Sequence, residues 1–479
     1  SMDNQRLLIW AFFGLMAWMT YQTWVQDYGP KPTPAATDQA GEPAAPEVSA
    51  PQPLDDDLPE ISDSGAPSSL PPAAGTGPSS VATPAAPSIR VTTDVFTLEI
   101  STKGGTLQNA VLLKYPVAKD RPDTLVELLD TRPEAIGLIE SGVRATAGGA
   151  EATHLTALSG EQASYELGAA DELTVPLRWA DEGGVVIEKR YRFRRGSYAI
   201  GLEHEVRNGS DALWRGAEYV RIKRQFGEQE RSMFDVDSYS FVGPIVYDGE
   251  KSEKLKRDDL INDGKYEFYS AQGWFGSIQH HFLSAAVPEA GKEQKYEVAV
   301  VGDNSIASAI GRNVETVAPG SSKTFRTTLF VGPKLQSQLE QIDKSLKLTV
   351  DYGWLTIISQ PLFWLLSKVF TFVGNWGVAI IVVTFLIKLA FYKLTESSGR
   401  SMAKMRNLQP RMKALQDRYK DDRQALSQAM MDLYKREKVN PAAGCLPILI
   451  QMPFFLAFYW VLLESVEMRQ APFALWITD

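Results

Sequence analysis

Cysteine and histidine are nearly absent from this chain of 479 residues. The only cysteine is Cys445, so the chain cannot form an internal disulfide and must be stabilised by its core. The four histidines, His154, His204, His280 and His281, do not have the spacing of a metal site. The sequence also lacks a glycine-rich phosphate loop and a nucleophile motif. We therefore predict no catalytic residues, no metal and no cofactor.

The chain has few long hydrophobic runs, and its overall composition does not reveal them. The chain is 44% hydrophobic and 22% charged with a net charge of −9, values that also fit a soluble acidic protein. Residues 7–25 nevertheless carry no charge and can cross roughly 30 Å of hydrocarbon, which predicts a transmembrane helix in residues 1–26. A secretory signal peptide is the alternative, although no small-residue cleavage site follows. Two further spans are predicted at residues 376–395 and 441–465.

The polar segment between the two later spans is basic. Residues 393–438 contain 12 Lys or Arg and 6 Asp or Glu, a net charge of +6 in a chain of −9. The positive-inside rule places this segment in the cytoplasm. Three crossings then put the N-terminus in the cytoplasm and residues 466–479 outside. The long acidic region between the first two spans also lies outside.

The exterior region divides by composition. Residues 27–88 are rich in Pro, Ala, Ser and acidic residues with almost no aromatic residue, which predicts a disordered tether. Residues 89–333 show period-two alternation and turn sequences such as Lys103-Gly104-Gly105, which predict a large antiparallel β-sandwich. Residues 334–375 are predicted to form a linking helix and then an amphipathic helix in the outer membrane interface. Counting that second helix as a span would place the basic segment outside.

One triplet in the predicted sandwich has the residue types of an acid–base site. Glu203, His204 and Glu205 are the kinds of residue that sugar-processing enzymes of sandwich fold use. Neighbouring residues of a strand point to opposite faces, however, so His204 is expected to face away from both glutamates. We therefore interpret the sandwich as a binding or spacing module.

Lys388 lies among apolar side chains in the second predicted span. A lysine at the centre of a membrane helix costs roughly 2.5 to 3.5 kcal/mol. Its side chain can reach the cytoplasmic headgroups, or its charge can line a water-filled cavity. Thr384 lies one turn earlier on the same helix face and supports a polar stripe. The residues alone leave both interpretations open.

The third predicted span and the basic segment add further candidate residues. Gln451 needs a partner in lipid, and nearby apolar side chains can serve either packing or a soft contact surface: Met452, Phe455, Phe458 and Tyr459. Apolar residues recur every three or four positions in residues 396–440, which predicts a cytoplasmic antiparallel helical hairpin kinked at Pro410. Its cations include Arg406, Arg411, Lys413, Arg418 and Arg423. Anionic lipid or ribosomal contact fits this charge, whereas too few aromatics are present for nucleic-acid binding.

Four stretches carry a resemblance to a known family. The sequences "NWGVAIIVVTFLIK", "MAKMRNLQPRMKALQDRYKDD", "GCLPILIQMPFFLAFYWVLLESVEMRQAPFALWITD" and "ISTKGGTLQNAVLLKYP" closely resemble the YidC membrane-protein insertases of Gram-negative bacteria. The resemblance implies an inner-membrane chaperone with a periplasmic supersandwich domain. Such an insertase acts on nascent inner-membrane proteins, alone or with the Sec translocon. The family continues with three further spans where this sequence ends at Asp479.

The resemblance also implies roles for single residues. The family uses a positive charge, usually arginine, in a hydrophilic groove that attracts the acidic tail of an incoming protein. Lys388 holds that place here, with Thr384 and Gln451 at polar groove positions, and Met452 and Phe455 at positions of an apolar slide. The alternatives are a membrane-anchored periplasmic carbohydrate-binding or carbohydrate-active protein, and a transporter, which would need more charges within its spans.

Overall fold

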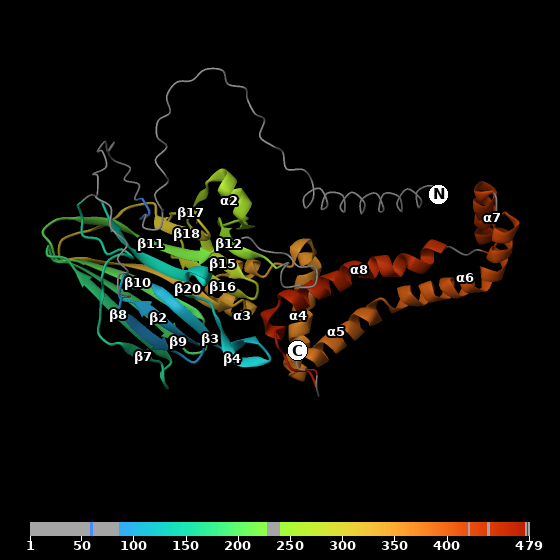
Figure 1. Ribbon diagram of the computed structural model, residues 1–479, viewed down its shortest axis with the longest axis horizontal. Coiled ribbons are helices and arrows are strands. Elements are labelled where there is room, and N and C mark those ends of the chain that lie inside the picture. Colours follow the sequence, from blue (N-terminus) through green and yellow to red (C-terminus); the bar gives the residue numbers. More distant parts are fainter. Residues whose placement is uncertain are drawn as a thin grey trace, which may run out of the picture. The chain divides into compact units, whose positions relative to one another are not determined.

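The computed structural model describes residues 58–60, 86–146, 148–227, 240–419, 422–437, 441–474 and 477. The predicted N-terminal span and almost all of the predicted tether lie outside these residues. The described strands run from Ser88 to Pro333 and form two sheets (Figure 1).

The two sheets are mainly antiparallel, with a parallel pairing between β1 and β7. The eleven-stranded sheet contains β14 (Lys265–Ser270), β17 (Gln294–Val301), β18 (Asn304–Gly311), β11 (Trp214–Gln225), β5 (Gly137–Ala145), β3 (Leu107–Ala118), β2 (Phe96–Ser101), β1 (Ser88–Thr92) and β7 (Ser164–Glu166) in that order, with β19 (Glu315–Val317) beside β11 and β4 (Arg121–Glu127) beside β3. The nine-stranded sheet has the order β13 (Ser252–Lys254), β12 (Val242–Tyr247), β15 (Trp274–Gln279), β16 (Phe282–Pro288), β20 (Ser322–Pro333), β10 (Ala199–Asn208), β9 (Val185–Arg194), β8 (Glu172–Ala180) and β6 (Ser159–Gly160).

The core lies between the sheets and follows the alternation of the sequence. Strand β9 buries every second residue, including Ile187, Tyr191 and Phe193, while the residues between them are more exposed. Phe96 of β2 meets Phe193 across the two sheets in an edge-to-face contact, with ring centroids 6.0 Å apart. The predicted antiparallel β-sandwich is therefore confirmed.

The predicted Lys103-Gly104-Gly105 turn places a backbone carbonyl inside this core. Gly104 has φ +67°, and a Cβ there would lie 2.2 Å from the carbonyl oxygen of His154, so only glycine fits. The Gly104 carbonyl accepts a hydrogen bond of 2.7 Å from Nζ of Lys189, which is buried on β9. Burial lowers the pKa of Lys189 to about 7. Lys189 thus occupies an inward position that the alternation assigns to an apolar residue.

His154 gives the β-sandwich a predicted sensitivity to acid. Its Nδ1 lies 2.6 Å from the hydroxyl of Tyr219, and burial, with Arg221 nearby, lowers its pKa from 6.5 to about 3. The unfolded chain binds a proton at this histidine below about pH 6.5, whereas the folded chain does not until about pH 3. Stability is therefore expected to fall as the pH drops through this window, by at most about 1.4 kcal/mol per pH unit for one histidine.

We expect the melting temperature of the detergent-solubilised protein to decrease between pH 7 and pH 5.5, and His154→Gln to make that decrease shallower. Differential scanning fluorimetry at fixed ionic strength measures both. An unchanged pH slope in His154→Gln would contradict the assignment.

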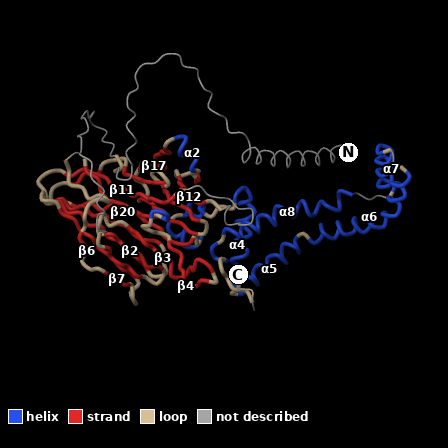
Figure 2. Tube along the Cα trace, viewed as in Figure 1, coloured by secondary structure: helices blue, strands red, loops and turns tan. Residues whose placement is uncertain are grey.

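Helices dominate the chain after Pro333 (Figure 2). The α-helices are α2 (Arg257–Asp263, within the β-sandwich), α3 (Gln336–Ile342), α4 (Thr356–Val373), α5 (Trp376–Ala390), α6 (Tyr392–Arg418), α7 (Arg423–Arg436) and α8 (Pro441–Glu464). Short 3-10 helices are η2 (Pro133–Ala135), η4 (Lys344–Thr349), η5 (Gly353–Leu355) and η6 (Val466–Met468).

The predicted linking helix is interrupted at Asp343. The Asp343 side chain accepts a hydrogen bond of 2.7 Å from the Ser345 amide, and η4 begins there.

Three of the described α-helices are apolar. By length and composition, α4 can cross a membrane, and α5 with α6 can count as one further span that is bent by 63°. In α8, which runs from Pro441 to Glu464, the residues whose side chains the structure describes include the apolar segment Leu449–Glu464. Helix α4 is continuous through Pro361, and helix α6 through Pro410. The interfacial position of residues 350–375 stays a prediction, because the same helix also has the dimensions of a span.

Candidate functional site

Lys388 lies in the last turn of α5, at the point where the helix axis changes direction. The Asn375 side chain begins α5 by accepting a hydrogen bond of 3.0 Å from the Val378 amide. Helix α5 ends at Ala390, and α6 starts at Tyr392 after a bend of 63°. The bend follows Lys388 by only a few residues, so the lysine is placed beside a break in the helix.

The Lys388 ammonium faces α8. Its Nζ lies 4.8 Å from the ring centroid of Phe455, a cation–π contact, and the lysine side chain remains exposed. Such a contact is worth about 0.5 to 1 kcal/mol at an exposed position. Two residues that were predicted for different roles, the groove charge and the slide, are therefore in contact.

Gln451 obtains the partner that a buried amide requires. It is buried on α8, one turn before Phe455, and its Nε2 donates a hydrogen bond of 3.3 Å to Oγ1 of Thr395 on α6. The Thr395 hydroxyl in turn donates to the Phe391 carbonyl at 3.1 Å, which also accepts the Thr395 amide at 3.0 Å. Sequence reasoning missed Thr395, and its only signal is a hydroxyl residue near the junction of two helices.

Thr384 lies one turn before Lys388 on α5 and is half-buried. Among the hydrogen bonds of the described residues, none links Thr384 to Lys388 or Gln451. The structure therefore brings Lys388 to Phe455 and Gln451 to Thr395, and it leaves Thr384 as a neighbour along the helix only.

The four predicted slide residues divide between two environments. Met452 and Tyr459 are 46% and 47% exposed, and Phe455 is half-buried. Positions 452, 455 and 459 recur at helical spacing and share one face of α8. Phe458 is instead 6% exposed and belongs to the core. Of the four predicted slide residues, Met452, Phe455 and Tyr459 therefore share an apolar face of α8, near which Leu449 and Leu456 are also exposed, whereas Phe458 is packed in the core.

Helices α6 and α7 form the two arms of a basic hairpin. Arg411 of α6 forms an ion pair of 2.5 Å with Glu437, and the Tyr434 hydroxyl lies 3.7 Å from Sδ of Met412. These contacts join the end of α7 to the later half of α6, which is an antiparallel arrangement. The five cations singled out from the sequence are all exposed: Arg406, Arg411, Lys413, Arg418 and Arg423. All five are accessible to a negatively charged surface, although Arg411 is already paired with Glu437.

A buried polar junction beyond the end of α8 was not predicted. Glu464, the last residue of α8, accepts hydrogen bonds from Nζ of Lys334 at 3.4 Å and from the Ser240 hydroxyl at 3.2 Å. Lys334 is 2% exposed and Glu464 is 8% exposed. Nε2 of His281 also donates a hydrogen bond of 2.9 Å to the Leu463 carbonyl. The junction ties α8 directly to the β-sandwich.

Helix α4 packs against α8 through a second buried polar contact. The Ser359 hydroxyl is fully buried and donates a hydrogen bond of 3.2 Å to the Ala457 carbonyl. Serine in an apolar helix often satisfies its hydroxyl in this way, and its small side chain lets two helices approach closely. Ser359, which interrupts the apolar run in the sequence, is thus a packing residue.

The triplet Glu203-His204-Glu205 does not form an acid–base site. His204 is buried, and its Nδ1 lies 2.7 Å from a carboxylate oxygen of Glu218 on the other sheet. Glu203 and Glu205 point to the opposite face, where both form ion pairs with Arg190 at 3.4 and 2.9 Å. The alternation that separates these side chains is the one expected from the sequence. In addition, no group of His, Cys, Asp or Glu within the described part of the chain is arranged to hold a metal ion.

Two family models match consecutive parts of the chain. Residues 88–365 match the YidC periplasmic domain, and residues 368–479 match the 60Kd inner membrane protein family. The first match contains the β-sandwich, and the second contains Lys388 and helices α5 to α8.

Curated relatives match the chain over its whole length. The membrane protein insertase YidC of Thioalkalivibrio sulfidiphilus is 43% identical over 497 residues, which cover 100% of this chain and 85% of the relative. The corresponding protein of Nitrosococcus oceani is 42% identical over 489 residues, with the same coverage. A solved galactose mutarotase related enzyme from Lactobacillus acidophilus covers 52% of this chain and is itself covered completely, but its identity of 10% and TM-score of 0.34 are too low to support an argument. The chain therefore belongs to the YidC family of membrane protein insertases.

Proposed function

We propose that the insertase activity depends on a hydrophilic groove whose positive charge is Lys388. Thr384 and Gln451 supply its polar lining, and the exposed face of Met452, Phe455 and Tyr459 supplies the slide. The observation that carries this proposal is the contact of 4.8 Å between the Lys388 ammonium and the Phe455 ring. The contact supports a site in which an acidic tail is attracted to a charge and the following apolar segment meets an apolar surface next to it.

The proposed chemistry is entirely noncovalent. An incoming carboxylate pairs with the ammonium, and in an environment of effective dielectric constant ~20 that attraction is about 4 kcal/mol at 4 Å, against about 1 kcal/mol in water. The apolar segment then leaves along side chains of similar polarity, so little free energy opposes its movement into lipid. We propose no catalytic residue, metal or cofactor for this process.

The proposed orientation follows from charge. The chain is a multi-pass protein with a cytoplasmic N-terminus, a periplasmic β-sandwich and a cytoplasmic α6–α7 hairpin, because residues 393–438 carry a net charge of +6 from 12 basic and 6 acidic residues. The proposed partners are nascent inner-membrane proteins, the Sec translocon and, at the hairpin, the ribosome or anionic lipids. A chaperone role in folding inserted proteins belongs to the same proposal.

A photo-crosslinking experiment tests the slide. A photoreactive phenylalanine analogue is placed at Phe455 or Tyr459, and ribosome-bound nascent chains of an inner-membrane protein are offered to the membranes. We expect crosslinks at these positions to exceed those at Leu386 by about tenfold, because Leu386 lies about 200° around α5 from Lys388 at a similar depth. Leu386 is itself 37% exposed, so it is a matched accessible control. Equal labelling at all three positions would contradict the proposed slide.

A further inference from the structure

A cleft lies on the outer face of the eleven-stranded sheet, and none of the described residues that line it belongs to the helices that the proposed function uses. It has a volume of about 340 Å³. Lys295 and Glu297 of β17 line it, together with Ile306, Ser308 and Ile310 of β18. These residues alternate with Tyr296 and Val298, which are buried in the core, so they point to the opposite face.

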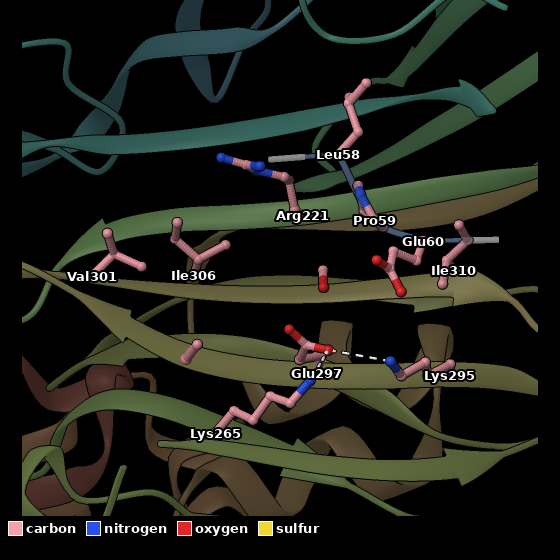
Figure 3. A pocket seen from close by; sticks show the side chains of 12 residues that line it. Leu58, Pro59, Glu60, Arg221, Lys265, Lys295, Glu297, Val301, Ile306 and Ile310 are labelled. Carbon is pink, nitrogen blue, oxygen red and sulfur yellow. Dashed lines mark hydrogen bonds and ion pairs between the residues drawn. The ribbon is translucent and has the colours of Figure 1, made fainter. Parts of the chain in front are cut away.

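A short piece of the predicted tether lies against the sheet at this cleft and forms part of its wall. Leu58, Pro59 and Glu60 line it together with the sheet residues (Figure 3). They are described although the neighbouring tether residues are not. Residues 61–87 separate them from the start of β1. Their position on the sheet is therefore a long-range contact within the chain.

Two contacts of different kinds hold the segment. The Leu58 side chain packs against a small buried apolar cluster on the outer face, formed by Ala217, Tyr219 and Ile310. The Pro59 carbonyl accepts a hydrogen bond of 3.0 Å from Nη1 of Arg144. One contact recognises an apolar side chain and the other recognises a backbone carbonyl, and peptide-binding sites combine these two kinds of contact.

The lysines of the cleft are already paired with carboxylates. Lys265 lies 3.3 Å from Glu297 and 2.9 Å from Glu267, and Lys295 lies 3.3 Å and 2.7 Å from the same two groups, so these four charges balance. Figure 3 shows the Glu60 carboxylate on the side of the cleft that also holds Ile310 and Lys295. The tether sequence from Leu54 to Glu60, "LDDDLPE", contains four acidic residues.

Pro59 also favours docking for an entropic reason. Proline fixes its own φ and biases the preceding residue to an extended conformation, so Leu58 loses less conformational freedom when it binds. Proline has no backbone N–H, and the observed hydrogen bond uses only its carbonyl. The segment is thus suited to a site that binds a backbone carbonyl and an apolar side chain.

We propose that the sheet side of this cleft is a docking site for a peptide with a leucine anchor followed by proline, and that Leu58–Glu60 of the tether is its resident ligand. Because the segment belongs to the same chain, its effective concentration at the cleft is of millimolar order. A peptide of the same chemistry from another molecule must therefore compete with the tether for the cleft.

Disulfide trapping tests the docked position in the full-length protein. In a Cys445→Ser background, Leu58→Cys is combined with Ile310→Cys in the cleft or with Arg194→Cys on β9 of the other sheet. Arg194 is 75% exposed, so that pair reports random collisions of the tether. We expect the cleft pair to form its disulfide at least about ten times faster under mild oxidation, measured by mass spectrometry of proteolytic fragments. Equal rates would overturn the proposal.

Peptide competition tests the site itself. A fluorescein-labelled peptide of residues 54–60 is titrated by anisotropy into the wild type and into a variant with Leu58→Ser, Pro59→Ser and Glu60→Ser. We expect at least tenfold tighter binding to the variant, because its cleft is vacated, and loss of that gain when Ile310→Glu is added. Melting temperatures check that each variant is folded. Equal affinity of the wild type and the triple variant, or binding that Ile310→Glu leaves intact, would overturn the proposal.

Discussion

Lys388→Ala is expected to reduce the insertion of substrates with acidic translocated tails by about tenfold, while neutral tails are inserted nearly as well as by the wild type. The reason is that a charge in a low-dielectric wall attracts a carboxylate more strongly than water would allow. A tenfold effect requires only about 1.4 kcal/mol of that attraction. The effect is measured by in vitro insertion of substrate pairs that differ only in the charge of their tails. Complementation of a depletion strain provides a second measurement in cells.

Two control variants separate the groove charge from a headgroup anchor. Lys388→Arg keeps the positive charge at any pH, so it is expected to retain insertion. Lys393→Ala removes a neighbouring lysine that is 91% exposed and pairs with Glu396 at 3.7 Å, so it is expected to be nearly silent. If Lys388→Ala inserts acidic and neutral tails equally well, Lys388 is a headgroup anchor and the proposed groove charge is wrong.

Lys334→Met is expected to have the largest effect on stability. It leaves the Glu464 carboxylate buried without the ammonium that now lies 3.4 Å away, and breaking one side of a buried ion pair typically costs about 3 to 5 kcal/mol. We expect a decrease in the melting temperature of the solubilised protein. We also expect faster proteolysis between α8 and the β-sandwich, because the junction loses its central contact.

The double variant Lys334→Met with Glu464→Leu is the decisive control. Replacing both partners of a buried pair by apolar residues of similar volume is often neutral or stabilising, so most of the lost stability should return. A double-mutant cycle then gives the coupling between the two sites. If the double variant is as unstable as the single one, the pair does not hold the junction and the surrounding packing does.

Local patterns predicted much of the fold. The alternation in β9 and the period of three to four residues in α6 and α7 report which faces are apolar, and both are properties of short stretches of sequence. The same alternation separated His204 from Glu203 and Glu205. Lys189 shows the limit of this reasoning, because its inward position depends on the Gly104 carbonyl, which lies 85 residues earlier.

The residues of the candidate site were proposed from the sequence, whereas their contacts were not. A charge such as Lys388 is conspicuous in an apolar helix, and the family resemblance implies a role for it. Its contact with Phe455 and the bond from Gln451 to Thr395 join different helices, and no periodicity within one helix reveals such pairing. The Lys334–Glu464 pair joins residues 130 positions apart, so the tertiary structure alone identifies it.

The position of Lys334 determines how a mechanical load on α8 is carried. Lys334 directly follows β20, which is bonded along nine residue pairs to β10 on one side and along seven to β16 on the other. Tension on Glu464 therefore passes through the ion pair into a strand in the interior of the sheet. Where the pull runs along that strand, its ladder hydrogen bonds are loaded together in shear and do not open one after another. A force that a moving segment exerts on α8 would thus be resisted by the whole nine-stranded sheet.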